Sequence, residues 1–165
     1  MRVVFFLLLL ATPCALTAQV LHIATASNFQ MTAKKINALF EQHHGYKTSM
    51  SSASTGALYS QILHGAPFAI FFAADVDTPM RLEANANSEA TMRACYALGS
   101  LVVVGSDNIQ RDLADPSLSI AIANPSTAPY GKAALAVLSR EEFTAGSRRT
   151  LVRANNVVQA YQHWY

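Results

Sequence analysis

The sequence predicts an α/β fold built on parallel β-sheets, and two observations support that prediction. Segments with strand-like and helix-like patterns alternate along the chain, which is typical of parallel sheets. Residues 68–73 and 118–123 are almost wholly apolar, as expected of strands that are buried on both faces. Charged residues make up 13% of the chain and hydrophobic residues 52%, so we expect a folded protein rather than a disordered one.

The first elements follow from hydrophobic spacing and from turn residues. Residues 20–24 are expected to form a strand, and the helix after it should end at Gly45. Residues 46–52 form a weaker strand, and the next helix should begin at residue 54 and end near residues 65–67. The apolar face of the first helix is expected to contain Ala33, Ile36, Leu39 and Phe40.

The middle of the chain is expected to hold a helix and a long strand. Thr78 and Pro79 have the order of a helix cap and a first helical residue. Residues 95–104 form a strand-like apolar run with a bend at Gly99. Within that run, Cys95 is expected to be an inert core residue.

The last part of the chain repeats the alternation of strand and helix. Residues 118–123 are a buried strand, residues 125–131 a loop, and residues 150–154 a short strand before a final helix. The helix after the loop should bury a face made of Ala133, Ala134, Val137 and Leu138. We expect the basic residues Arg148, Arg149 and Arg153 to form a solvated face.

Residues 1–18 are expected to be a secretory signal peptide. Arg2 precedes an apolar run over residues 3–11, and small or turn-prone residues lead to Ala18. The run is shorter than the roughly 20 residues of a membrane-spanning helix, so we expect no stable membrane insertion after cleavage. Because Arg2 leaves with the signal, the formal net charge falls from +2 to +1, which argues against nucleic acid as a partner.

Four loops share one feature, because each follows an expected strand and opens an expected helix with small, uncharged hydrogen-bond donors. They are residues 26–28, 54–56, 125–131 and 155–157. A helix N-terminus has unpaired N–H groups and a partial positive charge, and such loops gather at the carboxyl ends of parallel strands. The loops therefore predict a site for a tetrahedral oxyanion without lysine or arginine. Since the site has donors only, it should reject a protonated phosphate.

Several short motifs also occur in a defined order along the chain. They are residues 24–29, 54–62, 65–68, 72–75, 96–102, 120–125, 128–134 and 155–157. Together they resemble the motifs of periplasmic molybdate-binding proteins, from about residue 21 to the end of the chain. The resemblance implies a two-lobed periplasmic binding protein fold of type II that closes on molybdate or tungstate. It implies a periplasmic monomer that serves the permease of an ABC transporter and has neither a cofactor nor a catalytic residue.

The resemblance also implies the binding positions. Tyr130 and Val157 would act through backbone N–H groups, and Thr55 through its hydroxyl and backbone. Asn28 stands where many members of the family have serine, and Ala74 would line the pocket. The secondary candidates are Ser27 and Ser54.

The same resemblance divides the chain into a signal peptide (1–18), a first α/β lobe (19–97) and a partial second lobe (98–165). Residues 97–100 are the expected crossing strand between the lobes. Because the family continues beyond the position of Tyr165, we expect the second lobe and the return segment into the first lobe to be incomplete.

Three other functions stay open on the sequence alone. The protein could bind another oxyanion such as sulfate, or be a truncated remnant with weak or no binding. It could also be a secreted α/β hydrolase, although the chain has no Gly-x-Ser-x-Gly motif to hold a nucleophile. None of the five histidines has the spacing of a metal ligand, so a metal is expected only as part of the molybdate oxyanion.

Overall fold

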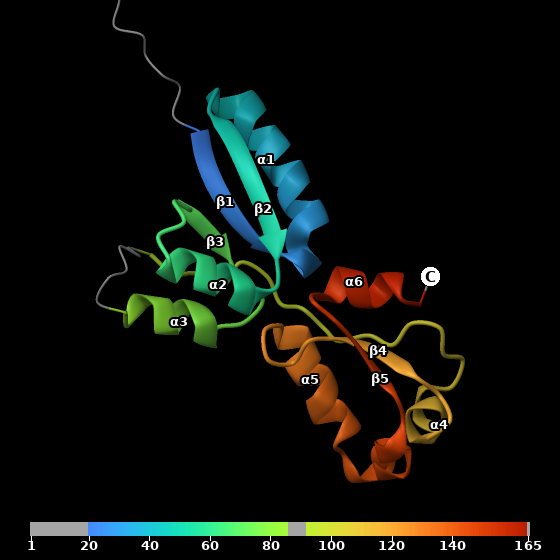
Figure 1. The fold of residues 1–165 in the computed structure, drawn as a ribbon. Coiled ribbons are helices and arrows are strands. Elements are labelled where there is room, and N and C mark those ends of the chain that lie inside the picture. Colours follow the sequence, from blue (N-terminus) through green and yellow to red (C-terminus); the bar gives the residue numbers. More distant parts are fainter. Residues whose placement is uncertain (1–19, 86–91, 165) are drawn as a thin grey trace, which may run out of the picture.

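The computed structural model describes residues 20–85 and 92–164, and the expected signal peptide lies outside these ranges. The described chain forms two parallel β-sheets, one of three strands and one of two, with helices beside them (Figure 1). The α/β fold with parallel sheets is therefore confirmed. Within the described ranges, no helix is both long and apolar enough to cross a membrane.

The three-stranded sheet is built from the first half of the chain. Its elements are β1 (Val20–Ala26), the 3-10 turn η1 (Ser27–Phe29), α1 (Gln30–His44), β2 (Lys47–Ala53), α2 (Thr55–Leu63), β3 (Ile70–Phe72) and α3 (Asp77–Glu83). The strand order is β2-β1-β3, so β1 lies in the middle. Because strand connections in parallel sheets are right-handed, α1 lies on one face of this sheet and α2 on the other (Figure 1).

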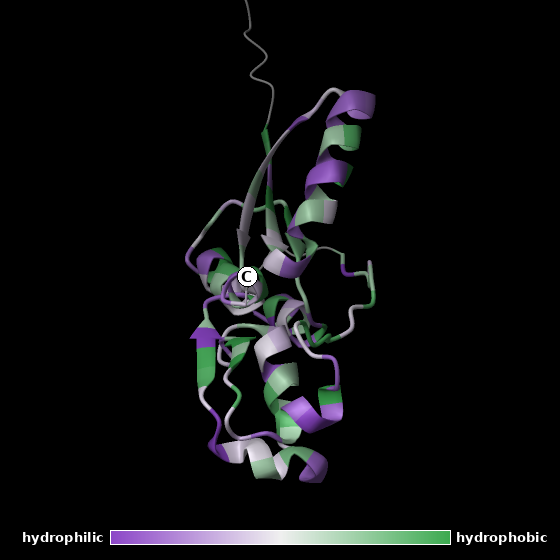
Figure 2. Ribbon diagram, turned by 90° about the vertical axis from the view of Figure 1, so that its right-hand side faces the viewer, coloured by the Kyte–Doolittle hydropathy of each residue, from purple (hydrophilic) through white to green (hydrophobic). Residues whose placement is uncertain are grey.

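Helix α1 ends as predicted but faces the sheet with a different side. Gly45 adopts the left-handed conformation with φ 71°, as a helix C-cap glycine does. The buried residues of the helix are Ala33 and Asn37, whereas Ile36 and Leu39 are 44% and 56% exposed. Figure 2 shows hydrophilic and hydrophobic bands alternating along this helix. The predicted apolar face was therefore wrong for Ile36 and Leu39, because the side of the helix that contains Ala33 and Asn37 is the buried one.

The two-stranded sheet is built from the second half of the chain. Its elements are α4 (Ile109–Ala114), β4 (Ile120–Ala123), α5 (Pro129–Leu138), η2 (Glu141–Arg148), β5 (Leu151–Ala154) and α6 (Val157–Gln162). β4 and β5 pair in parallel over four residues each. The sequence predicted β4, α5, β5 and α6, and it did not predict the short helices α4 and η2.

Two predicted strands are less buried than expected. β3 covers only Ile70–Phe72, and Ile70 is 37% exposed because β3 lies at the edge of its sheet. β4 buries Ile122 and Ala123, whereas Leu118 lies before the strand and is exposed. Both runs are apolar, but an edge strand or a strand end cannot be covered on every side.

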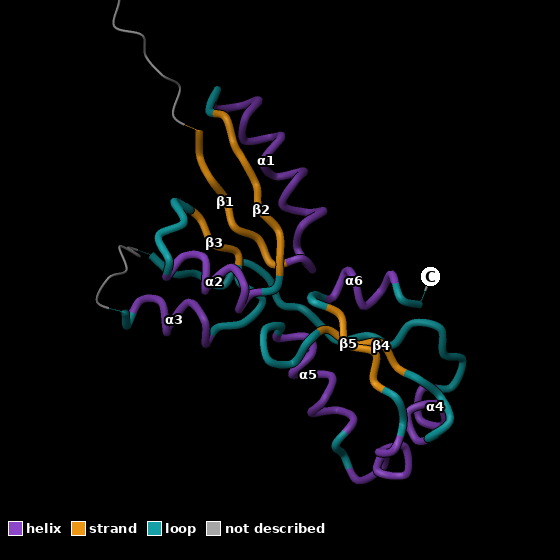
Figure 3. Tube along the Cα trace, in the orientation of Figure 1, coloured by secondary structure: helices purple, strands orange, loops and turns teal. Residues whose placement is uncertain are grey.

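The strand predicted over residues 95–104 does not form. The segment is drawn as a loop that runs from the three-stranded sheet to the two-stranded sheet (Figure 3). Leu98 is 95% exposed, and Cys95 is exposed instead of buried in a core. An apolar run forms a strand only where another strand offers hydrogen bonds, and no described strand pairs with this one. The division into lobes at residues 97 and 98 stays a prediction.

Arg149 is buried, which corrects the prediction of a solvated basic face. Its Nε donates to the carbonyl of Gly146 at 2.7 Å, and its terminal nitrogens donate to the carbonyls of Asp112 and Leu113. The last two carbonyls belong to α4, and a cation near the carboxyl end of a helix is favourable. Arg149 thus fastens α4 to η2.

We expect Arg149→Ala to lower the free energy of unfolding by about 2 kcal/mol, because three carbonyls, two of them in buried hydrogen bonds, lose a charged donor. The neighbouring Arg148 is exposed, so Arg148→Ala should change the same quantity by less than about 0.5 kcal/mol. Chemical denaturation of both variants measures the difference. Equal losses would contradict the role of Arg149 in joining α4 to η2.

Candidate functional site

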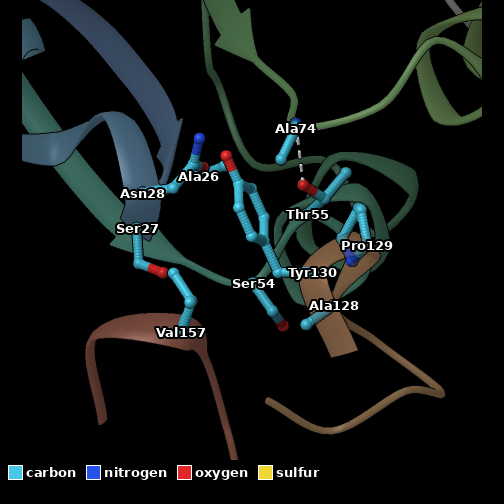
Figure 4. Close-up of a pocket in the computed structure, with 10 residues that line it drawn as sticks. All are labelled: Ala26, Ser27, Asn28, Ser54, Thr55, Ala74, Ala128, Pro129, Tyr130 and Val157. Atoms are coloured by element: carbon cyan, nitrogen blue, oxygen red, sulfur yellow. Dashed lines mark hydrogen bonds between the residues drawn. The ribbon is translucent and has the colours of Figure 1, made fainter. Parts of the chain in front are cut away.

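The carboxyl ends of all five strands in the described part of the chain lead into one pocket. The residues that line it are Ala26, Ser27, Asn28, Ser54, Thr55, Ala74, Ala128, Pro129, Tyr130 and Val157 (Figure 4). Each group follows a different strand within a few residues, as ligand sites in parallel sheets do. The pocket therefore receives residues from both sheets.

All seven residues named from the sequence lie at this pocket. They are Asn28, Thr55, Ala74, Tyr130, Val157, Ser27 and Ser54. None of the ten lining residues is a lysine, arginine, aspartate or glutamate. The structure thus brings the candidate residues together around an uncharged cavity, and their role in binding stays a prediction.

Thr55 is the side chain whose hydrogen bonding is best defined. It is 1% exposed at the start of α2, and its Oγ1 accepts a hydrogen bond of 3.0 Å from the backbone N–H of Ala74 (dashed line in Figure 4). A hydroxyl has one proton to donate and two lone pairs. Because the Ala74 amide uses a lone pair, the Thr55 proton can be directed into the cavity.

Two helices present uncapped N-termini to the pocket. Ser54 precedes α2 and Ala128 precedes α5, and neither side chain forms a capping hydrogen bond with a described residue. Ser54 forms no capping bond, although serine is among the residues that cap helices most often. One amide of the first turn of α2 is nevertheless used, because the Gly56 N–H donates to the carbonyl of Thr127. α6 differs, because the Asn156 side chain accepts from the N–H of Gln159. Helix starts without a side-chain cap can offer backbone N–H groups to an anion, so the starts of α2 and α5 are candidate donor positions.

The two halves of the chain touch beside the pocket. The N–H of Gly56, in the first turn of α2, donates to the carbonyl of Thr127 at 2.8 Å. A Cβ on Gly56 would lie 2.9 Å from that same carbonyl oxygen, which is too close for two non-bonded atoms. Only glycine allows this approach, so Gly56 sets the spacing between α2 and the loop before α5.

The cavity itself is small. Its volume is about 10 Å³, which is room for roughly one water molecule. An ion with four oxygens is larger than this cavity. Within residues 20–85 and 92–164, no group of three or more His, Cys, Asp or Glu side chains could hold a metal ion directly.

Three lining residues were not among the sequence candidates. Ala26 ends β1, Ala128 precedes α5, and Pro129 is the first residue of α5. All three lie in loops that the sequence had marked, and proline at the first helical position is a recognisable start signal. The sequence therefore identified the loops, but it did not name these three residues within them.

Two parallel α/β units that contribute strand ends to a shared uncharged pocket define a two-lobed ligand-binding protein. Residues 21–164 match the family model of the bacterial extracellular solute-binding proteins, and the chain belongs to that family. The family match and the similarity to a solved structure of this fold confirm the two-lobed binding protein fold that the motifs predicted.

Individual relatives are similar over most of this chain. The molybdate-binding protein ModA of Azotobacter vinelandii is 39% identical over 155 residues, which cover 90% of this chain and 62% of that protein. The protein of the same name from Rhodobacter capsulatus is 33% identical over 144 residues, which cover 84% of this chain and 57% of that protein.

Solved structures give the same picture. The periplasmic molybdate-binding protein of Azotobacter vinelandii matches with a TM-score of 0.65 and 30% identity over 87% of this chain and 65% of that chain. A substrate-binding domain from Clostridium difficile matches with a TM-score of 0.51 and 19% identity over 85% of this chain and 64% of that chain, which supports the fold alone. This chain spans less than two thirds of the length of each of these relatives.

Proposed function

We propose that this chain binds molybdate or tungstate in the pocket at the strand ends and delivers it to the permease of an ABC importer. The observation that carries the proposal is the convergence of five strand ends on an uncharged cavity lined by donors. The molybdate-binding relatives support the choice of ligand. In this proposal, residues 1–18 are an export signal, residues 19–97 and 98–165 form the two lobes, and a monomer acts in the periplasm.

The chemistry of the pocket favours a fully deprotonated oxyanion. Backbone N–H groups at the starts of α2 and α5 donate, and the Thr55 hydroxyl donates because it already accepts from Ala74. Each hydrogen bond to a charged group contributes about 1.5–3 kcal/mol, so a few donors outweigh the entropy lost on association. An ion with its own O–H, such as hydrogen phosphate, would bury that donor without an acceptor.

Each candidate residue has a defined part in the proposal. Asn28 donates from its side-chain amide, and Tyr130 and Val157 donate backbone N–H groups from the starts of α5 and α6. Ser27 and Ser54 are both buried at the pocket and offer hydroxyls as additional donors. Ala74 provides a small side chain that leaves room for the ion, and its amide orients Thr55. No step requires a resident cofactor or a charged side chain.

Calorimetric titration with four ions tests the function. We expect molybdate and tungstate to bind with micromolar or tighter dissociation constants, sulfate to bind at least tenfold more weakly because it is smaller, and phosphate to give no measurable heat. A preference for sulfate would move the assignment to another oxyanion. Equal weak binding of all four ions would overturn the proposal and favour a chain without transport function.

A further inference from the structure

One peptide group beside the pocket is hydrogen-bonded at both ends. It joins Ala73 to Ala74, directly after β3. Its carbonyl oxygen accepts a hydrogen bond of 2.6 Å from the hydroxyl of Tyr96, and its N–H donates to Thr55 Oγ1 at 3.0 Å. The three groups therefore form a continuous chain from Tyr96 to the Thr55 hydroxyl.

Tyr96 is held in place by aromatic packing. Its ring centroid lies 4.8 Å from that of Phe29 and 5.2 Å from that of Phe72. Phe29 follows the candidate residue Asn28, and Phe72 is the last residue of β3. Tyr96 itself belongs to the loop that connects the two sheets, and it is not one of the residues that line the pocket.

The hydroxyl of Tyr96 acts as a donor. Partial burial raises the pKa of Tyr96 above its ordinary value, so the group keeps its proton at neutral pH. Hydrogen bonds in a chain polarise one another, and each bond is strengthened by roughly 10–30%. A donor on the Ala73 carbonyl makes the Ala74 N–H a better donor, and that in turn makes the Thr55 O–H a better donor.

We propose that Tyr96 is a positioning residue for the anion site, because it orients the Ala73–Ala74 peptide and through it directs the Thr55 proton into the pocket. Tyr96 does not touch the ligand. The effect on affinity rests on the proposed function, while the hydrogen-bond chain itself belongs to the free protein.

A double-mutant cycle with molybdate as the probe tests the relay. Tyr96→Phe keeps the ring and its packing but removes the donor, and we expect about a fivefold loss of affinity. Thr55→Val removes the hydroxyl at nearly constant shape, and we expect at least a tenfold loss. In the Thr55→Val background, Tyr96→Phe should change affinity by less than about 1.5-fold, because the Thr55 hydroxyl through which Tyr96 acts on the ligand is absent.

Tyr46→Phe is the matched control. Tyr46 is 57% exposed beyond the end of α1, where it stacks on Phe40, so loss of its hydroxyl should leave affinity unchanged. If Tyr96→Phe is as harmless as Tyr46→Phe, or if the Tyr96 and Thr55 substitutions are additive, the positioning role is overturned.

The amide NMR signal of Ala74 provides a readout that needs no ligand. In free Tyr96→Phe, the Ala74 amide proton should move upfield as its hydrogen bond to Thr55 weakens, whereas Tyr46→Phe should leave it in place. An unmoved Ala74 signal in Tyr96→Phe would overturn the relay. If the unmodified chain fails to bind molybdate, the proposed function fails, and the Ala74 signal still decides the relay.

Discussion

Replacing Asn28 with aspartate is expected to weaken molybdate binding by at least 100-fold. Asn28 lines a pocket without any charged side chain, and aspartate has nearly the same shape as asparagine. A carboxylate about 4 Å from one unit of negative charge costs about 4 kcal/mol near a protein surface, and molybdate carries two units. Asn28 is exposed, so solvent screens part of this repulsion, but about 3 kcal/mol already corresponds to more than 100-fold.

Two further variants show whether charge in the pocket is the cause. Asn28→Ser keeps a neutral donor at the same position, and we expect a loss of less than about tenfold. Gln110→Glu adds the same charge on the exposed surface of α4, and affinity should not change, because ordinary salt screens charges beyond about 10 Å. If Asn28→Asp binds molybdate as well as Asn28→Ser does, the ion does not bind next to Asn28.

The positions of the pocket loops could be predicted because each rests on local sequence. Thr55 lies between a strand and a helix in sequence, and the parallel arrangement of strands then places it at the carboxyl edge. The same logic applies to Asn28 and Tyr130. Since the strands of a parallel sheet point the same way, their carboxyl ends lie at one edge. A sequence that shows where the strands end therefore also shows where the pocket loops lie.

Features that depend on packing could not be predicted. The apolar run at residues 95–104 has the composition of a strand, but strand formation depends on a pairing partner that composition does not reveal. The link from Tyr96 to Ala73 joins residues 23 positions apart, and no local pattern indicates it. The burial of Arg149 could not be predicted for the same reason, because its carbonyl partners in α4 lie 36 and 37 positions away in the sequence.

Gly131→Ala is expected to lower the free energy of unfolding by about 3 kcal/mol and molybdate affinity by at least tenfold. Gly131 is buried in the first turn of α5, where that helix crosses the end of β4. A Cβ there would overlap the carbonyl oxygen of Ala123 and lie 2.7 Å from its carbonyl carbon. These obstacles are backbone atoms that no side-chain rotation can clear, so the helix start must move by about 1 Å, at the cost of overpacking. That movement carries the Tyr130 N–H away from the pocket.

Gly45→Ala is the control that distinguishes the effect of steric overlap from the effect of backbone conformation. Gly45 has a φ of 71°, and a Cβ there would meet nothing within 4 Å. Gly45→Ala should therefore cost only about 1–2 kcal/mol, through backbone strain, and should leave molybdate affinity unchanged, because the end of α1 is far from the pocket. Thermal melts with and without molybdate compare the two variants. Of the two glycines, Gly131 is the one that links the packing of α5 to the proposed anion site. If Gly131→Ala melts and binds molybdate like the unmodified chain, the start of α5 does not hold the ligand.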